Sequence, residues 1–396
     1  MSIYLFAFFY ILLCAYIFDI KKARKYVNLH YILICVLLIL IAGLRYRVGG
    51  DTLSYFDDYN SFPTFSAFPH TDFSELKYEP LFYTITAFSK LIYPDFAVFQ
   101  FVQASIVNIT FFYVIARRTP YRFLSVCFYF LLMYFYFNME IMRESISVCV
   151  FLLSVKYIEK RNYFVYYVFA VIAYSIHTSA IFLFPFPLLY IVLQNGTKYV
   201  VFLFILITLL FVYIMDNPVV LLYLPLKVAL KLYNYVSGGP MDLKGAVLNY
   251  IHIAALWLIL HVGKKNNCLN MQFAPFLKAN ILIYSVTPFI SGVYRITNYF
   301  AVFEILALVG VCMELLKSWR IKQVSFLRIL SAGILLLLLK FQHETINTSE
   351  YAANTRFYNL YIPYESVFTP KRHLNRENIY YIQMQEIHFL KEKNRK

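Results

Sequence analysis

LHYILICVLLILIAGLRYRVGGDTLSY, residues 29–55, joins a long apolar run to a loop with two arginines, a glycine pair and an aspartate. We interpret 29–44 as a membrane-spanning helix, because a helix satisfies its own backbone hydrogen bonds inside lipid. The charged loop then begins where the chain leaves the bilayer. This placement raises the question of which partner the two arginines meet there.

The composition of the whole chain agrees with this reading. Of its 396 residues, 61% are hydrophobic and only 14% are charged, and the mean hydropathy is +0.62. A soluble domain cannot bury that much apolar surface in one core. We therefore predict an all-α, polytopic integral membrane protein with about twelve transmembrane helices, at 2–19, 29–44, 96–116, 123–139, 142–158, 163–176, 178–193, 199–215, 247–262, 278–292, 296–316 and 327–341.

Basic residues predict the orientation of these spans. They gather in alternate short loops, which is typical of the cytoplasmic side: 21–25, 117–122, 159–161, 263–265 and 317–322. The N-terminus and the long loops 45–95 and 216–246 are then expected outside. We expect one transmembrane domain over 1–370 and a polar, basic tail over 371–396, with short interfacial or surface helices at 80–93 and 218–236.

Several functional classes are disfavoured. The net charge of +15 follows the loops and forms no basic stripe with aromatics, so no nucleic-acid partner is expected. The six cysteines show no disulfide or zinc spacing. No Walker loop or D-x-D pair appears, which disfavours ATP-driven transport and metal-dependent nucleotide-sugar enzymes. We expect neither a metal nor a cofactor.

Ionisable residues from four separate segments are expected on the outer side: Arg45, Arg47 and Asp51 after the second span, Arg143 at the start of the fifth, His177 at the end of the sixth and Arg295 at the start of the eleventh. Such groups are costly near lipid unless they are paired, so they mark functional sites. The alternative is that these side chains have no functional role and either extend to the lipid headgroups or pair with a nearby carboxylate. This alternative fits Arg143 best, because Glu140 and Glu144 lie within one predicted helical turn of it.

Arginine suits one class of ligand in particular. Its rigid fork of donors matches phosphate oxygens and remains charged at any working pH. Gly49 and Gly50 let the backbone approach a ligand closely. A diphosphate on a lipid carrier would meet both the arginines and the apolar spans, and its sugars would lie among the outer loops.

Five short motifs, taken in order, resemble those of the EpsG family. They are RVGGDTLSY (47–55, with the preceding Arg45), YEPLFY (78–83), MRESI (142–146), SIHTSA (175–180) and PYESVF (363–368). These proteins are Wzy-like polymerases of bacterial exopolysaccharide, capsule and O-antigen. Family members often have glutamine where this chain has Glu144.

The resemblance implies a GT-C-like glycosyltransferase in the bacterial inner membrane with its active site on the outer face. It implies undecaprenyl diphosphate-linked oligosaccharide as substrate, with a flippase and a chain-length regulator as partners. Arg45, Arg47, Arg143 and Arg295 would stabilise the leaving diphosphate, with Arg47 and Arg295 the strongest candidates. His177 would be the base, with Asp51, Glu79 and Glu144 as rivals. Sugar contacts are expected at Tyr55, Glu79, Tyr294 and Tyr364.

Other functions share parts of this pattern. A flippase for the same lipid also needs arginines, but in a cavity that both leaflets reach. A membrane acyltransferase would use a histidine nearer the inner side than His177. A ligase that moves finished glycan to another acceptor uses the polymerase's chemistry, and the sequence leaves that alternative open.

Overall fold

The computed structural model describes most of the chain, with gaps. The described residues are 2–73, 76–194, 202–203, 205–206, 209, 213, 217, 243–265, 273–289, 291–318, 328, 331–335, 360–374, 376–378 and 380–381. They are mostly helical, and the extended pairing among them is a single bridge between Arg45 and Ser366. The predicted all-α class is confirmed for this part of the chain. The predicted spans 199–215 and 327–341 and the predicted surface helix 218–236 lie largely or wholly outside it.

The chain divides into two compact units. Unit 1 comprises Met1–Cys149, Ser175–His177 and Ile321–Lys396, and unit 2 comprises Val150–Tyr174 and Thr178–Arg320. Helix α7 (Met142–Glu159) passes from the first unit into the second. Each unit is described by itself below.

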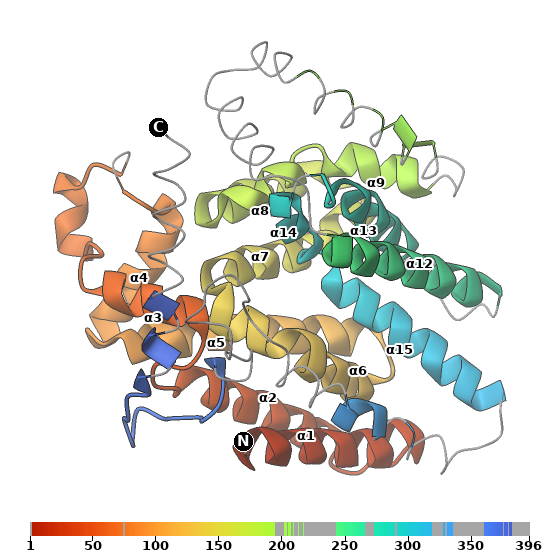
Figure 1. Ribbon diagram of the computed structural model, residues 1–396, viewed down its shortest axis with the longest axis horizontal. Coiled ribbons are helices and arrows are strands. Elements are labelled where there is room, and N and C mark those ends of the chain that lie inside the picture. The colour runs from red at the N-terminus through yellow and green to blue at the C-terminus, as the bar shows by residue number, and fades with distance from the viewer. Residues whose placement is uncertain are drawn as a thin grey trace. The chain divides into compact units, whose positions relative to one another are not determined.

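Unit 1 contains the N-terminal helices. They are α1 (Ser2–Cys14), η1 (Ala15–Ile20), α2 (Val27–Gly43), α3 (Gly50–Tyr59), η2 (Phe65–His70), α4 (Pro80–Ile92), α5 (Phe96–Arg118), α6 (Arg122–Tyr129), η3 (Phe130–Tyr134) and η4 (Tyr136–Glu140). Helix α2 packs along α5, and α1 packs on α2 and α6 (Figure 1). The α2–α5 contact is close because Gly43 has no side chain: a Cβ there would lie 2.9 Å from the Cα atom of Phe101.

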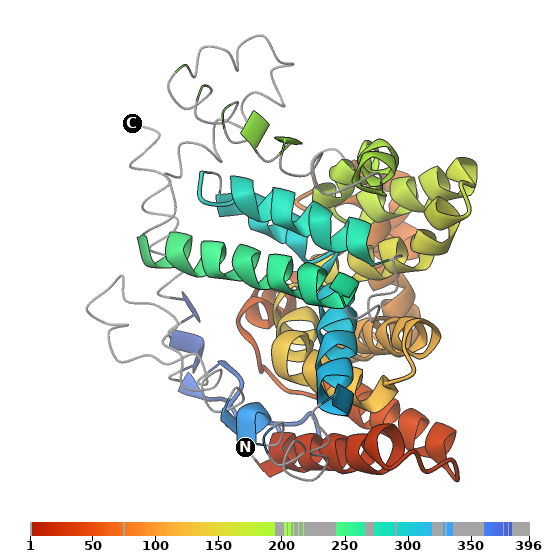
Figure 2. The same ribbon diagram turned by 90° about the vertical axis from the view of Figure 1, so that its right-hand side faces the viewer.

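Unit 2 contains most of α8 (Tyr163–Ile176), then η5 (Thr178–Leu183), α9 (Phe186–Gln194), α12 (Leu243–Lys265), α13 (Ala274–Val286), η7 (Ser291–Val293), α14 (Tyr294–Thr297) and α15 (Ala301–Ser318). Helix α13 packs on α9 and on α12, and α15 packs on both α12 and α13 (Figure 2). The buried Lys278 on α13 donates a hydrogen bond to the Leu193 carbonyl, 2.7 Å away at the end of α9. This bond satisfies one of the carbonyls that a helix end leaves open.

Three described helices are long and apolar enough to cross a membrane: Ser2–Ile20, Phe96–Arg118 and Gly245–Lys265. Four shorter apolar helices are Val27–Gly43, Arg122–Tyr134, Tyr163–Ile176 and Ala274–Val286. Three predicted spans are not single helices. Of these, 278–292 leaves the α-helix where α13 ends at Val286. The expected span 178–193 is divided into η5 and α9, and 296–316 is divided into α14 and α15 by a turn. Pro185 accounts for the break in 178–193, because proline removes a backbone donor.

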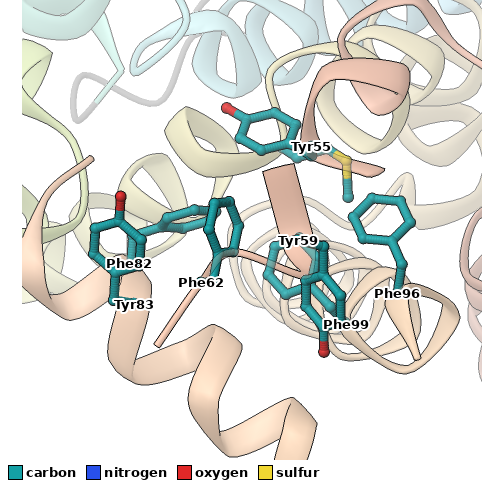
Figure 3. Close-up of a cluster of buried hydrophobic side chains, with 8 residues drawn as sticks. Tyr55, Tyr59, Phe62, Phe82, Tyr83, Phe96 and Phe99 are labelled. Atoms are coloured by element: carbon teal, nitrogen blue, oxygen red, sulfur yellow. The ribbon is translucent and has the colours of Figure 1, made fainter. Parts of the chain in front are cut away.

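The loop after α2 and helix α4 lie on α5 through a cluster of aromatic side chains. Its buried members are Tyr55, Tyr59, Phe62, Phe82, Tyr83, Phe96, Phe99 and Met142, of which the seven aromatic residues are labelled in Figure 3. The rings meet mostly edge-to-face or tilted, as aromatic quadrupoles prefer. This cluster fixes the first half of the predicted outer loop 45–95, together with the predicted interfacial helix at 80–93.

A closed ring of three hydrogen bonds holds the π-helix η4 in place. Asn108 Nδ2 donates to Asn138 Oδ1 (2.8 Å), Asn138 Nδ2 donates to the Tyr129 hydroxyl (3.1 Å), and that hydroxyl donates to Asn108 Oδ1 (3.1 Å). All three residues are fully buried. The ring ties η4 to the middle of α5 and so positions the residues that follow η4.

We predict that Asn138→Ala destabilises unit 1 by about 1–3 kcal/mol, because it removes two buried hydrogen bonds, one from the Asn108 amide to Asn138 and one from Asn138 to the Tyr129 hydroxyl. Thermal unfolding of the detergent-solubilised protein measures this. Ser105→Ala on helix α5 is the control, since Ser105 is partly exposed and its hydroxyl donates to the Phe101 carbonyl of its own helix. Equal midpoints for the two variants would contradict the prediction.

Candidate functional site

The loop after α2 is pinned by the segment that follows the last predicted span. Tyr46 donates its backbone N–H to the Glu365 carbonyl (2.8 Å), and Val367 donates to the Leu44 carbonyl (2.9 Å). Gly49 N–H donates to the Leu360 carbonyl (2.8 Å). Two of the quoted motifs, far apart in the sequence, therefore lie side by side in unit 1.

Arg45 is fully buried beneath this loop. Its guanidinium donates to the carbonyls of Val48 (3.1 Å) and Ala42, and to the Thr52 hydroxyl (3.0 Å). Burial lowers the pKa of Arg45 to about 10. The position matches a side chain that shapes the loop from inside, rather than one that presents its charge to a ligand.

Arg47 has a positive φ of 53°, which turns the loop back, and it is only 7% exposed. Its Nε donates to Glu377 Oε1 at 2.7 Å, and its guanidinium lies 4.6 Å from the centre of the Phe56 ring. Burial alone lowers the pKa of Arg47, but the Glu377 carboxylate outweighs it, so the net shift is upward. The anion that the sequence leaves unidentified is, in this structure, a carboxylate from the chain's own tail.

The tail is held by further contacts. Arg372 forms a second ion pair with Glu377, and Arg376 donates to the Arg47 carbonyl (2.9 Å). The Tyr381 hydroxyl donates to Asp57 (2.8 Å). Nothing in the sequence pattern pointed to Glu377, because it lies in a stretch read only as polar and basic.

Glu140 closes the N-terminus of α3. Its two carboxylate oxygens accept the backbone N–H groups of Gly50 (2.8 Å) and Asp51 (3.1 Å), which are donors that a helix start leaves open. Gly49, with φ of 101°, allows this approach, since a Cβ there would lie 2.5 Å from the Met139 carbonyl oxygen. Burial, and next the charge of Asp51, raise the pKa of Glu140 to about 7.

Glu140 does not share a helix with Arg143 and Glu144, so the predicted placement of all three within one helical turn is wrong for Glu140. Ile141 has ψ of 48°, so Glu140 ends η4 and is separated from α7, which begins at Met142. Glu144 and Ser147 are buried on α7. The break leaves Glu140 with the backbone of α3 instead.

Arg143 pairs with Glu79, the residue directly before α4. Their Nη1–Oε2 distance is 2.6 Å, and both side chains are 15% exposed. The guanidinium lies 4.6 Å from the centre of the Tyr78 ring, and Tyr78 donates its hydroxyl to Asp58 (2.8 Å). The Arg143 Nε is buried and has no hydrogen-bond partner within the described residues. This is an unsatisfied donor on a cation in the middle of the quoted motifs.

The remaining candidates of unit 1 differ in exposure. Tyr55 belongs to the buried aromatic cluster (Figure 3), so its ring is a packing element. Tyr364 is partly exposed, with its ring edge-to-face against Tyr4. Asp51 is exposed at the start of α3, whereas His177 is 6% exposed.

Unit 2 carries the two other candidates next to each other. Tyr294 and Arg295 begin the short helix α14, and both are exposed. Arg295 is therefore the one arginine of the four candidates that the structure places on the surface. The order of exposure runs from Arg45, fully buried, through Arg47 and Arg143 to Arg295.

We predict that Arg47→Ala lowers the thermal unfolding midpoint more than Arg372→Ala does. Removing Arg47 leaves the buried Glu377 carboxylate without one of its two cations. Loss of a buried ion-pair partner lowers the free energy of unfolding by about 3 kcal/mol, and the remaining pair with Arg372 reduces this loss. The side chain of Arg372 is 60% exposed, so water screens its ion pair and its loss should destabilise the protein only slightly. Equal shifts in detergent would mean that the tail is not anchored through Arg47.

Comparison with known proteins supplies one match. The model of the EpsG family matches residues 28–366, which covers more than half of the chain and all five quoted motifs except the last residues of PYESVF. No curated protein and no solved structure matches the chain. Given this match and the geometry above, the chain is a member of the EpsG family.

Proposed function

We propose that this protein is a membrane glycosyltransferase that polymerises undecaprenyl diphosphate-linked oligosaccharide repeat units at the outer face of the bacterial inner membrane. Family membership supports a membrane protein of polysaccharide biosynthesis, and the apolar helices support its location in a membrane. The specific reaction rests on the arginines. A flippase would supply the lipid-linked units, and a chain-length regulator would act on the product.

The observation that carries the proposal is the state of Arg143. Buried donors almost always have a partner, and an exception calls for an explanation. Arg143 gives one hydrogen to Glu79, while its Nε has no acceptor within the described residues. A phosphate oxygen would complete the set, because a guanidinium binds phosphate through two parallel donors. The unsatisfied Nε therefore makes Arg143 the best-suited diphosphate ligand in unit 1.

The reaction explains why such a cation is needed. The acceptor hydroxyl attacks the anomeric carbon, the bond from that carbon to the phosphate oxygen breaks, and its electron pair leaves on the diphosphate. The hydroxyl proton passes to a base. A positioned guanidinium lowers the energy of the charge that develops on the leaving group.

The four arginines then have different roles. Arg45 supports the loop from below, and Arg47 holds the tail through Glu377. Arg143 is the diphosphate ligand that we propose in unit 1, and Arg295 is the candidate phosphate ligand of unit 2. This differs from the sequence-based order, which favoured Arg47 over Arg143.

The other candidates remain parts of the proposal. Asp51 is the exposed carboxylate among the proposed bases, and His177 and Glu144 are buried. Tyr364 and Tyr294 keep an exposed ring for a sugar. Glu79 orients Arg143 through their ion pair.

We predict that Arg143→Ala and Arg295→Ala each reduce polymer formation by about 10²-fold or more, as the loss of one transition-state donor does in other enzymes. Arg143→Lys should recover little, because an ammonium lacks the planar fork. The measurement is the ratio of single lipid-linked repeat units to polymer in cells that carry each variant.

Arg117→Ala is the matched control, since Arg117 is an exposed arginine at the end of α5, on the predicted cytoplasmic side. Each variant is also quantified in the membrane fraction, so that loss of protein is separated from loss of activity. Normal polymer from Arg143→Ala at a normal protein level would reject the assignment of Arg143.

A further inference from the structure

We propose that His252 and Glu304, in unit 2, form a histidine–carboxylate dyad that accepts the proton of the attacking hydroxyl. This proposal deepens the proposed function and rests on it. Neither residue belongs to the five sequence motifs. The argument starts from the way three helices of unit 2 bring polar side chains together.

The dyad lies between α12 and α15. His252 Nε2 is 3.2 Å from Glu304 Oε2, and the other oxygen of Glu304 accepts a hydrogen bond from the Asn280 amide on α13. Both carboxylate oxygens thus face nitrogen donors, as an ionised carboxylate requires. A carboxylate oxygen only accepts, so the neutral imidazole has its hydrogen on Nε2 and its lone pair on Nδ1.

The imidazole is held in place from two further sides. Its ring centre lies 4.4 Å from that of Tyr284 on α13. Asn249, one turn earlier on α12, donates to the Tyr284 carbonyl at 2.6 Å and fixes the two helices against each other. Glu304 and Tyr284 are the titratable side chains that contact His252 from the helices packed on α12.

The imidazole of His252 is only partly covered by the protein. The side chain of His252 is 41% exposed, whereas Glu304 behind it is 14% exposed. His252 borders the buried face of α12, which Asn249, Ile253 and Leu256 mark. His177, the base expected from the sequence, is only 6% exposed. The protein therefore covers less of His252 than of His177.

Two titratable side chains in contact within membrane helices need a reason. Titratable groups in apolar spans are costly and are found where a protein uses them. His252 lies about 14 Å along α12 from Leu243, the end predicted to be outside, at 1.5 Å per residue. Asn280 Oδ1 is buried and has no donor within the described residues, so the cluster can still accept one hydrogen bond.

The same cluster also contacts the element that carries Arg295. Asn280 Nδ2 lies 3.5 Å from the Thr297 carbonyl at the end of α14. Arg295 lies on that short helix. A base and an exposed cation are thus built on neighbouring elements of one unit, as attack and departure of a leaving group require.

In the proposed step, His252 Nδ1 takes the hydrogen of the acceptor hydroxyl. The oxygen keeps the electron pair and forms the bond to the anomeric carbon, while the diphosphate leaves with the pair of the broken bond. Glu304 stabilises the imidazolium, which afterwards releases its proton to water.

The test is a polymerisation assay on the purified full-length protein in liposomes, with a synthetic polyprenyl diphosphate-linked repeat unit. His252→Gln keeps an amide donor to Glu304 but cannot accept a proton. We expect its kcat to fall by about 10²-fold or more, with KM for the lipid-linked unit within about twofold of the original. Glu304→Gln should reduce kcat by about tenfold.

His261→Ala is the matched control, because His261 is an exposed histidine on the same helix α12. It should leave kcat within about twofold. For His252→Ala, added imidazole should restore part of the rate, which a merely structural role of His252 would not allow. His177→Gln is assayed beside these variants.

The outcomes separate the two proposals. If the unaltered protein does not polymerise the lipid-linked unit, the proposed function fails. If the unaltered protein polymerises it and His252→Gln does so at a similar kcat, the dyad is wrong and the proposed function stands. If His252→Ala does not fold, the isosteric His252→Gln decides the question alone.

Discussion

The structure of unit 1 depends on one constraint: a guanidinium beside an apolar span must find its partners within the protein. Arg45 meets it with backbone carbonyls and a hydroxyl, Arg47 with the Glu377 carboxylate, and Arg143 with Glu79. The loop after α2 takes its path from these contacts. The tail is drawn onto the loop because it supplies Glu377. Charge pairing thus joins segments that apolar packing alone would leave apart.

The sequence predicted the helical class and most helix positions of the described residues. It did not predict the ion-pair partners, since Glu79 and Glu377 lie far from their arginines along the chain and no periodicity connects them. It also missed the break at Ile141, because the spacing of Glu140, Arg143 and Glu144, three and four residues apart, fits one continuous helix. The single backbone angle of Ile141 moves Glu140 from Arg143 to the N-terminus of α3.

The two units bring different parts of the proposed chemistry. Unit 1 holds Arg143, whose Nε has no hydrogen-bond acceptor among the described residues. Unit 2 holds the exposed Arg295 and the pair of His252 with Glu304. Within unit 2, the Asn280 amide that contacts Glu304 also lies 3.5 Å from the Thr297 carbonyl of α14, the helix that carries Arg295.

The most direct test of the central claim is an experimental structure of the protein with a polyprenyl diphosphate-linked donor bound. The account predicts a phosphate oxygen within about 3 Å of the Arg143 guanidinium, with Nε as one of the donors. A donor whose diphosphate is bound elsewhere, with Arg143 still held by Glu79 alone, would contradict it.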